Sequence, residues 1–343
     1  MRRAKFDQNM KTKDASRATP FVSVIIPARN EEIVLPETLK AVFANEYPQD
    51  CFEVLVIDNG SEDATAEIAR EVGASVHRLD GVNVGAVRNF GVEKAKGEYL
   101  AFLDADCIPD ADWLSKGVAA LQEERCIAGS TYDVPEEADW IEKTWFSQRE
   151  HGRVETTHIN AGNLFVAREL FFEIGGFDAS LPTGEDTEFC TRARAITRII
   201  SDERVRVVHL GNPRTLRDFI RREIWYGLGA LGTYRINPFD KPLIGTVVFA
   251  IALSVQIASI CGILMGYPWQ CGFALGSSVV AMLLVGTVLY RWRFTRTWDE
   301  RLRLLLLYYF FYLGRAISFI YILTGSTFYH GIEKAALDDQ LEA

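Results

Sequence analysis

Residues 98–109 read Glu98-Tyr-Leu-Ala-Phe-Leu-Asp104-Ala-Asp106-Cys-Ile-Pro109. The apolar run predicts a buried strand that ends in two carboxylates one residue apart. Carboxylate oxygens are ligands that Mg²⁺ and Mn²⁺ prefer, and ligands of open α/β sheets gather outside the carboxyl ends of the strands. Two aspartates in a loop can also be solvated turn residues or a helix cap, so the metal-site interpretation depends on the rest of the chain.

Length, charge and cysteine usage limit the class of protein. The chain has 343 residues and a net charge of -9. We therefore expect two structural parts and no nucleic-acid partner, because nucleic acid needs a broad basic surface. The 6 cysteines are scattered without C-x-x-C or zinc-like spacing, which is typical of buried thiols in a reducing compartment.

The first 19 residues are polar and basic and lack an apolar core. They are not a signal peptide, so the domain that follows is expected in the cytoplasm. We interpret residues 1–19 as a disordered basic leader, and contact with anionic lipid is the alternative.

Three apolar segments follow near the other end of the chain, at about 243–265, 271–290 and 304–324. The first two carry no charge and predict a membrane-spanning helical hairpin. The third contains Arg315, which is costly in hydrocarbon unless it faces protein or a headgroup, so an interfacial or re-entrant helix is the alternative to a third span. The basic segment 291–303 predicts a multi-pass protein of the bacterial inner membrane, with this loop and the large domain cytoplasmic and the tail at 327–343 outside.

Strand and helix patterns alternate in the large domain. Apolar runs predict strands at 21–26, 52–57, 74–77 and 98–103, with helices at 31–44, 63–72 and 84–96 between them. This alternation indicates a mostly parallel α/β sheet flanked by helices, with Asp58 and the Asp104/Asp106 pair at one edge. No G-x-G-x-x-G follows the first strand and no Walker lysine motif is present, which argues against dinucleotide dehydrogenases and P-loop enzymes.

Several motifs occur in an order that resembles one known family. They are Val22-Ser-Val-Ile-Ile-Pro-Ala-Arg-Asn-Glu-Glu32, Val54-Leu-Val-Ile-Asp-Asn-Gly-Ser-Glu-Asp-Ala-Thr65, Ala86-Val-Arg-Asn-Phe-Gly91, Leu103-Asp-Ala-Asp106, Asn160-Ala-Gly-Asn-Leu-Phe165, Gly175-Gly-Phe-Asp178 and Gly184-Glu-Asp-Thr-Glu-Phe189. Each is common alone, but their order and spacing resemble the family-2 inverting glycosyltransferases of the GT-A fold over about residues 21–230. The chain looks similar to membrane-anchored bacterial members that act on lipid-linked or cell-surface glycans.

This resemblance implies a division of the chain and a set of ligand contacts. It implies a cytoplasmic GT-A domain at 20–212, an amphipathic interface helix and linker at 213–240, and a membrane domain at 241–326. A nucleotide-diphosphate sugar, with UDP favoured, would contact Pro27, Ala28, Asn30, Glu31, Asp58, Arg88, Asp104, Asn163, Arg221 and Arg222. Mg²⁺ or Mn²⁺ would neutralise the departing diphosphate, held by Asp106 and His209.

The same resemblance assigns the general base to Asp186, with Glu185 as the second candidate. Asp186 has an alternative role as N-cap of a helix at 187–195. His209 follows a strand-like run at 204–208, and a lone histidine at such a place is often a satisfied core or surface residue.

Two amphipathic segments leave further alternatives open. Arg214, Arg217 and Arg221 share a helix face, which predicts a helix lying on the membrane, a diphosphate clamp formed by Arg221 or Arg222, or both. Residues 136–150 predict an amphipathic helix that lines an acceptor groove, lies on lipid or packs in the ordinary way.

We therefore expect an enzyme that transfers one sugar to a lipid-linked or cell-envelope glycan acceptor at the membrane. The Q-x-x-R-W motif of processive members is replaced by Phe219-Ile-Arg-Arg-Glu-Ile-Trp225, which favours single transfer. A processive polysaccharide synthase and a polyprenyl-phosphate glycosyltransferase are alternatives. A catalytically silent membrane scaffold is an alternative of another class, disfavoured because a scaffold has no use for Asp58, Asp106 and Asp186 together.

Overall fold

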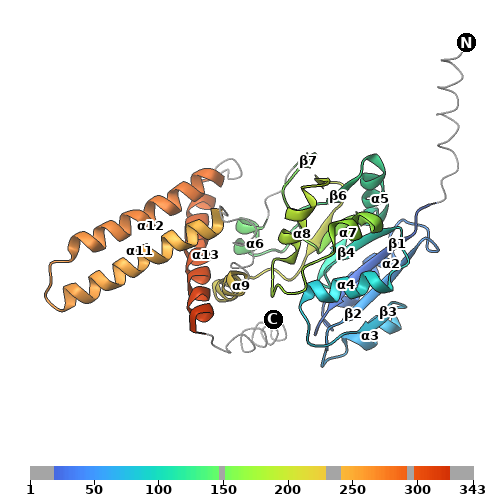
Figure 1. Cartoon of the computed structure of the whole chain (residues 1–343), viewed down its shortest axis with the longest axis horizontal. Coiled ribbons are helices and arrows are strands. Elements are labelled where there is room, and N and C mark those ends of the chain that lie inside the picture. Colours follow the sequence, from blue (N-terminus) through green and yellow to red (C-terminus); the bar gives the residue numbers. More distant parts are fainter. Residues whose placement is uncertain (1–18, 147–150, 229–240, 292–296, 325–343) are drawn as a thin grey trace, which may run out of the picture.

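A computed structural model of the chain describes residues 19–146, 151–228, 241–291 and 297–324. Within them an α/β domain is followed by a helical hairpin and a further long helix (Figure 1). The predicted leader at 1–19, except for its last residue, and the tail at 327–343 lie outside the described residues, as do parts of the predicted linker and basic loop.

The α/β domain is built on an eight-stranded sheet of order β3-β2-β1-β4-β8-β6-β9-β7. Its strands are β1 (Val22–Ala28), β2 (Phe52–Asp58), β3 (Ser75–Arg78), β4 (Tyr99–Leu103), β6 (Cys126–Gly129), β7 (Arg153–Glu155), β8 (Asn163–Ala167) and β9 (Arg198–Asp202). Strands β1 to β4 are parallel, and β8 runs antiparallel between β4 and β6. The four strands expected from apolar runs are confirmed.

Helices cover both faces of this sheet. One face packs against α2 (Leu35–Phe43), α3 (Thr65–Glu71) and α5 (Trp113–Glu123). The other packs against α4 (Val84–Lys94), α7 (Arg168–Ile174) and α8 (Glu185–Ala193). Burial on both faces explains why the central strands are continuous apolar runs instead of alternating ones.

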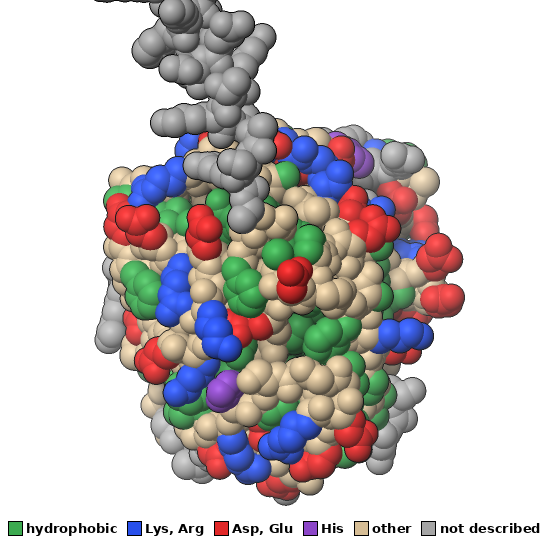
Figure 2. Space-filling model, turned by 90° about the vertical axis from the view of Figure 1, so that its right-hand side faces the viewer, with side chains coloured by type: hydrophobic (Ala, Val, Ile, Leu, Met, Phe, Trp, Pro, Cys, Tyr) green, Lys and Arg blue, Asp and Glu red, His purple; other side chains and the backbone are tan. Residues whose placement is uncertain are grey.

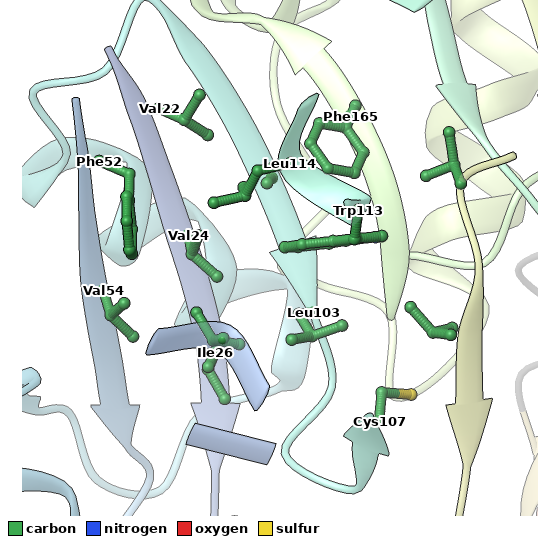
Figure 3. Close-up of a cluster of buried hydrophobic side chains, with 14 of the residues drawn as sticks. Val22, Val24, Ile26, Phe52, Val54, Leu103, Cys107, Trp113, Leu114 and Phe165 are labelled. Atoms are coloured by element: carbon green, nitrogen blue, oxygen red, sulfur yellow. The ribbon is translucent and has the colours of Figure 1, made fainter. Parts of the chain in front are cut away.

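The alternation of side chains along β1 divides the core into two layers. Val22, Val24 and Ile26 point to the first layer, where Trp113 and Phe165 meet edge to face with ring centroids 4.7 Å apart (Figure 3). Ile25 points to the second layer. All of these side chains are fully buried, so the strands and the loops that leave them have a rigid base.

A second, two-stranded sheet lies beside the first. Strand β5 (Cys107–Pro109) follows the Asp104/Asp106 pair, and β10 (Val207–His209) runs antiparallel to it, with His209 opposite Cys107. This pairing places a residue about a hundred positions away in sequence next to the two aspartates.

Beyond the sheet the chain forms α6 (Trp140–Trp145), α9 (Leu216–Leu228), α11 (Lys241–Leu264), α12 (Gln270–Arg291) and α13 (Trp298–Thr324). The helices α11, α12 and α13 are long and apolar enough to cross a membrane. The predicted hairpin is confirmed as α11 and α12, while α13 begins six residues before the predicted 304.

The two ends of the molecule have opposite surfaces. At the end of the α/β domain away from the hairpin, acidic and basic side chains are interspersed with small apolar areas (Figure 2). On the hairpin, large apolar side chains such as Ile251 and Met282 are 61% and 66% exposed. The first surface suits water, whereas the second suits hydrocarbon.

Candidate functional site

The site forms where the parallel strands of the sheet end. The register of β1 and β2 sets Ala28 beside Asp58, and the next strand, β4, ends at Leu103 directly before Asp104. The carboxyl ends of these strands therefore meet at one edge of the sheet, as the sequence predicted.

Four potential ligands meet at this edge. Asp104, Asp106, Cys107 and His209 offer atoms that all lie within 4.8 Å of one another. His209 Nε2 lies 3.4 Å from Asp106 Oδ2, and the buried His209 Nδ1 has no hydrogen-bond partner within the described part of the chain. Two carboxylates and an imidazole form a donor set that fits Mn²⁺ or Mg²⁺.

The thiol of Cys107 is less suited to such an ion. Burial and the neighbouring aspartates raise its pKa well above the ordinary thiol value, so it stays protonated at neutral pH. A hard divalent ion prefers the oxygen and imidazole donors around it.

Two glycines let the backbone approach the aspartates closely. A Cβ on Gly211 would lie 1.9 Å from Asp106 Oδ2, and one on Gly162 would lie 2.1 Å from Asp104 Oδ2. Any side chain at either position would displace a carboxylate, so the two loops depend on glycine for the shape of the cluster.

Tyr132 holds the histidine and one aspartate in place, and the sequence analysis missed it. Its ring stacks on His209 with centroids 4.9 Å apart and an interplanar angle of 14°, and its hydroxyl donates to Asp104 Oδ2 at 3.4 Å. Burial and the charge of Asp104 raise the pKa of Tyr132 far above its usual value, so the hydroxyl remains a donor.

Arg88 joins the cluster of Asp104, Asp106 and His209 to helix α8. Its guanidinium donates to Asp104 Oδ1 at 2.7 Å and to Glu185 Oε1, and the side chain is only 5% exposed. Burial opposes the charge, but Asp104 and Glu185 outweigh burial and raise the pKa of Arg88. The structure therefore places Arg88 between two carboxylates, and it places Glu185 in a buried ion pair.

Asp186, the other candidate for the general base, is held in a different way from Glu185. Its Oδ1 accepts from the Thr187 amide at 2.6 Å, and its Oδ2 accepts from the Ala161 amide at 3.4 Å. Gly184, with φ of 82°, is the N-cap of α8, so Asp186 lies inside the first turn and is not the cap. The side chain of Asp186 is 21% exposed, three times the 7% of Glu185.

His158 lies beside Asp186 and was not predicted from the sequence. Its Nε2 is 4.0 Å from Asp186 Oδ2 and 2.6 Å from Asn160 Oδ1. The segment 158–162 thus contacts Asp186 through Ala161 and Asp104 through Gly162. No local motif marks His158, because its proximity comes from the tertiary fold.

The loops after β1 and β2 complete the nucleotide side of the predicted site. Asp58 Oδ1 accepts from the Ser61 amide at 2.9 Å, while its buried Oδ2 lies 3.7 Å from Arg78 and has no hydrogen-bond partner among the described residues. Pro27 and Ala28 end β1, so the sheet fixes them beside Asp58.

Asn30 and Glu31 follow on the same side. Asn30 has a φ of 56°, a left-handed conformation that its side chain stabilises by accepting from the Glu62 amide at 2.8 Å. Burial and the charges of Asp106 and Asp104 raise the pKa of Glu31. Burial contributes most to this shift, and the part due to the neighbouring aspartates is the part that a bound cation would relieve.

The structure does not bring two of the residues predicted to contact the nucleotide sugar, Asn163 and Arg221, to the cluster. Asn163 is fully buried, accepts from Trp113 Nε1 at 2.8 Å and donates to the Val205 carbonyl at 2.8 Å, so the structure brings its side chain to the core and not to the site. Arg221 lies on α9, 4.0 Å from Asp218.

The neighbouring Arg222 reaches toward the cluster of Asp104, Asp106 and His209. It donates to the Gly211 carbonyl at 3.0 Å, next to Asp106, and to the Tyr226 hydroxyl at 3.1 Å. Arg222 therefore ties α9 to the loop that shapes the cluster.

This combination of sheet and acidic cluster defines a class. The chain has the GT-A-like fold of nucleotide-sugar transferases, and it shares that fold with the mannosyltransferase PcManGT from Pyrobaculum calidifontis, solved in complex with GDP-Man and Mn²⁺. The TM-score is 0.57 at 18% identity, and the match covers 92% of this chain and 93% of that one.

Sequence comparison gives the family. Residues 23–177 match Glycosyl transferase family 2, so this part of the chain is a family-2 glycosyltransferase domain. It is 34% identical to Glycosyltransferase AglE of Haloferax volcanii over 51% of this chain and 61% of that protein. It is 26% identical to a beta-monoglucosyldiacylglycerol synthase of Nostoc over 50% of this chain and 41% of that protein. The chain thus spans about half the length of these curated relatives.

Proposed function

We propose that the enzyme transfers one sugar, with inversion, from a nucleotide-diphosphate sugar to a lipid-linked or glycan acceptor at the cytoplasmic face of a cell membrane. The observation that carries this proposal is the junction of the Asp104, Asp106 and His209 cluster with Asp186. Arg88 and the segment 158–162 connect the two parts. A metal-assisted departure and a base-assisted attack need such groups side by side.

Asp106 and His209, with Asp104, are the residues that would hold Mg²⁺ or Mn²⁺. When bound, the ion would neutralise charge on the diphosphate leaving group. His209 presents a buried nitrogen without a protein partner, and Gly211 leaves Asp106 the room it needs. The neighbour with GDP-Man and Mn²⁺ supports this use of the same fold.

The nucleotide would lie over the ends of β1, β2 and β4. There Asp58 offers a carboxylate oxygen that accepts no hydrogen bond from the described residues, which suits an N–H group of uracil or guanine. Pro27, Ala28, Asn30 and Glu31 would shape the pocket around the nucleoside. Arg88 would act by holding Asp104 in position instead of touching phosphate.

Asp186 is our choice as general base because Glu185 is occupied by Arg88. The acceptor hydroxyl oxygen would attack the anomeric carbon while Asp186 takes its proton. The bond from that carbon to the diphosphate oxygen breaks, and the diphosphate leaves with the electron pair. A single displacement of this kind inverts the configuration at the anomeric carbon.

The membrane helices indicate where the acceptor is met. The α/β domain is tied through α9 and α13 to an exposed apolar hairpin, and insertion of this hairpin in a bilayer would hold the site beside the membrane. The synthase relative is named for a glucosyl-diacylglycerol product, which supports a lipid acceptor. We propose the division into a catalytic domain at 20–212, an interface region at 213–240 and a membrane domain at 241–326.

The test is a screen of UDP- and GDP-sugars with the purified full chain, Mn²⁺ or Mg²⁺ and a lipid extract as acceptor. We expect transfer from one donor, loss of transfer in excess EDTA, and a product with one added sugar whose anomeric configuration is opposite to that of the donor by NMR. Retained configuration would overturn the inverting mechanism. Long polymeric products would overturn single transfer, and donor binding without turnover would favour the scaffold.

A further inference from the structure

The three long apolar helices have different surroundings. On α11 and α12, large apolar side chains such as Ile257, Leu275 and Met282 are more than half exposed. On α13, one side is buried against α6 and α9, the helices that lead to the catalytic domain. The ring of Trp145 on α6 lies 4.8 Å from Tyr308 and 5.5 Å from Phe311.

Helices α9 and α13 pack so closely that their backbones are nearly in contact. A Cβ on Gly314 would lie 2.9 Å from the Glu223 Cβ, and one on Gly227 would lie 2.1 Å from Ser318 Oγ. Between these two contacts, Arg315 Nε donates to Glu223 Oε2 at 3.0 Å. Arg315 is thus paired with a buried carboxylate of α9, so it faces protein and not hydrocarbon.

These contacts hold a long stretch of α13 at the same level, relative to a membrane, as the helices that lead to the catalytic domain. They run from Tyr308 to Ser318, ten residues or about 15 Å along a helix axis. The partner of Tyr308 and Phe311 is α6, and the partner of Gly314, Arg315 and Ser318 is α9, which carries four charged residues at 217, 218, 221 and 222. If α13 crossed the bilayer, it would draw α6 and the charged helix α9 into the hydrocarbon core, over about half of its thickness of about 30 Å.

The hairpin meets α13 only near its own base in the described contacts. Gly245 and Phe249 in the first turns of α11 pack on Tyr312, and Thr287 and Arg291 at the end of α12 bond to Tyr312 and Tyr308. Figure 1 shows α13 running across the base of the hairpin instead of alongside it.

The outer side of α13 is continuously apolar. At 3.6 residues per turn, Leu302, Leu306, Leu313 and Ile320 share a side opposite the Arg315 contacts, and no charged residue falls among them. Leu302, Leu306 and Ile320 are 63%, 42% and 59% exposed. The opposite side of α13 is bound to protein, through buried residues such as Leu304, Leu307 and Phe311 and through the Arg315–Glu223 ion pair, so only the 302–320 side is free to contact lipid.

We infer that α13 lies along the membrane surface on the side of the catalytic domain, and that the helix side with Leu302, Leu306, Leu313 and Ile320 contacts the lipid. Among the three long helices, only α11 and α12 then cross the bilayer. We assign lipid as the partner of this apolar side, because α13 lies at the base of the hairpin and the hairpin itself is inserted in the membrane. The segment after α13 then stays on the catalytic side, and the sequence-based topology with an outer tail is replaced. This inference does not depend on the proposed reaction.

The first experiment compares the sides of three engineered cysteines in spheroplasts. The full-length background carries Cys51→Ser, Cys261→Ala and Cys271→Ala, because these native thiols are exposed or partly exposed, unlike the three buried ones. Lys96→Cys marks the catalytic domain, Tyr267→Cys marks the hairpin turn, and Ala343→Cys marks the segment after α13. A membrane-impermeant maleimide is applied before and after permeabilisation.

We expect Ala343→Cys to label together with Lys96→Cys, and Tyr267→Cys to label on the opposite side. Because the comparison is internal, it holds for either orientation of the hairpin. If Ala343→Cys labels together with Tyr267→Cys, α13 crosses the bilayer and the inference is overturned.

The second experiment measures depth in reconstituted vesicles of phosphatidylethanolamine and phosphatidylglycerol. Spin labels are placed in the same background at Leu306→Cys, Leu313→Cys and Ile320→Cys, all on the outer side of α13. A surface helix predicts similar depths, about 5–10 Å below the headgroup boundary. A spanning helix predicts a progressive change of about 21 Å from 306 to 320, at 1.5 Å per residue, and that result would contradict the inference.

Discussion

The two sides of the site are built in different ways. The proposed donor side comprises Asp58, Asp104, Asp106 and His209, and it stands on the ends of neighbouring strands and on the β5–β10 pair. The proposed acceptor side comprises Asp186 and His158, and it stands on the first turn of α8 and on the segment 158–162. Strand pairing fixes the first, whereas the Arg88 ion pairs and two amide hydrogen bonds fix the second.

The difference shows how one chain can hold several acids in separate roles. Glu185 is buried and paired with Arg88. Its neighbour Asp186 is partly exposed, accepts from the amides of Ala161 and Thr187 and from the Thr187 hydroxyl, and lies 4.0 Å from the His158 ring. The structural acid and the proposed base differ by one position in sequence. The start of α8 separates them, because successive residues of a helix point in different directions.

The largest effect is expected on the donor side, where Asp106→Ala removes a proposed metal ligand. We expect kcat/KM to fall about 10³-fold or more, because several kcal/mol of charge stabilisation at the leaving group depend on the ion. Titration calorimetry with Mn²⁺ should show lost binding in Asp106→Ala. Asp112→Ala, at the partly exposed N-cap of α5, is the matched control, and equal Mn²⁺ binding in the two variants would refute the ligand assignment.

A large effect on stability is expected where the two sides meet. Glu185→Gln removes a partner of Arg88 and leaves a buried charge less compensated, so we expect a loss of about 3–5 kcal/mol. Thermal unfolding followed by tryptophan fluorescence measures it. The control is Glu173→Gln, which removes the acid of the exposed pair with Arg125 and should cost less than about 1 kcal/mol. An equal loss in the two variants would contradict this account.

A smaller effect is expected for Asp58→Asn, which tests recognition of the nucleotide. Asparagine can still accept from the Ser61 amide, but it turns an N–H group toward the nucleotide base in place of Oδ2. We expect the donor KM to rise about tenfold, the effect of about 1.4 kcal/mol, with kcat little changed. Steady-state kinetics over a donor series decides this, and a fall in kcat alone would place Asp58 elsewhere in the reaction.

The smallest effect is expected away from the site, at Asp202 in β9. Burial tends to raise its pKa, but hydrogen bonds from Arg204 outweigh burial and hold the pKa below the usual value of about 3.9. The carboxylate therefore stabilises the fold above about pH 4, and this contribution disappears as the pH falls through the lowered pKa. Asp202→Asn should lose about 1 kcal/mol at pH 7, less at pH 3, and keep its kcat.

Much of the fold could be predicted because both faces of the central strands are covered. Buried strands such as β1 and β2 are near-continuous apolar runs, and their ends mark where Asp58 and Asp104 stand. Helix starts were less predictable. Helix α2 begins at Leu35, four residues after the predicted start, because Asn30 and Glu31 form the loop that bonds to Ser61 and Thr65.

The residues that sequence reasoning missed or placed differently depend on long-range packing. Tyr132 and His158 reach the site from loops without a motif, and Asn163 satisfies Trp113 in the core although its motif resembles a binding segment. The partner of Arg315 is 92 positions away in α9. Periodicity along the chain reports which side of an element is apolar, but not which element covers that side.

The most direct test of the central claim is the turnover of Asp186→Asn, measured with the donor affinity in one preparation. The amide keeps the size of the side chain and can accept from the Thr187 amide, but it cannot take a proton. We predict an unchanged donor Kd and a kcat lower by about 10²–10⁴-fold. A kcat close to that of the unmodified enzyme would contradict the assignment of the base and the mechanism built on it.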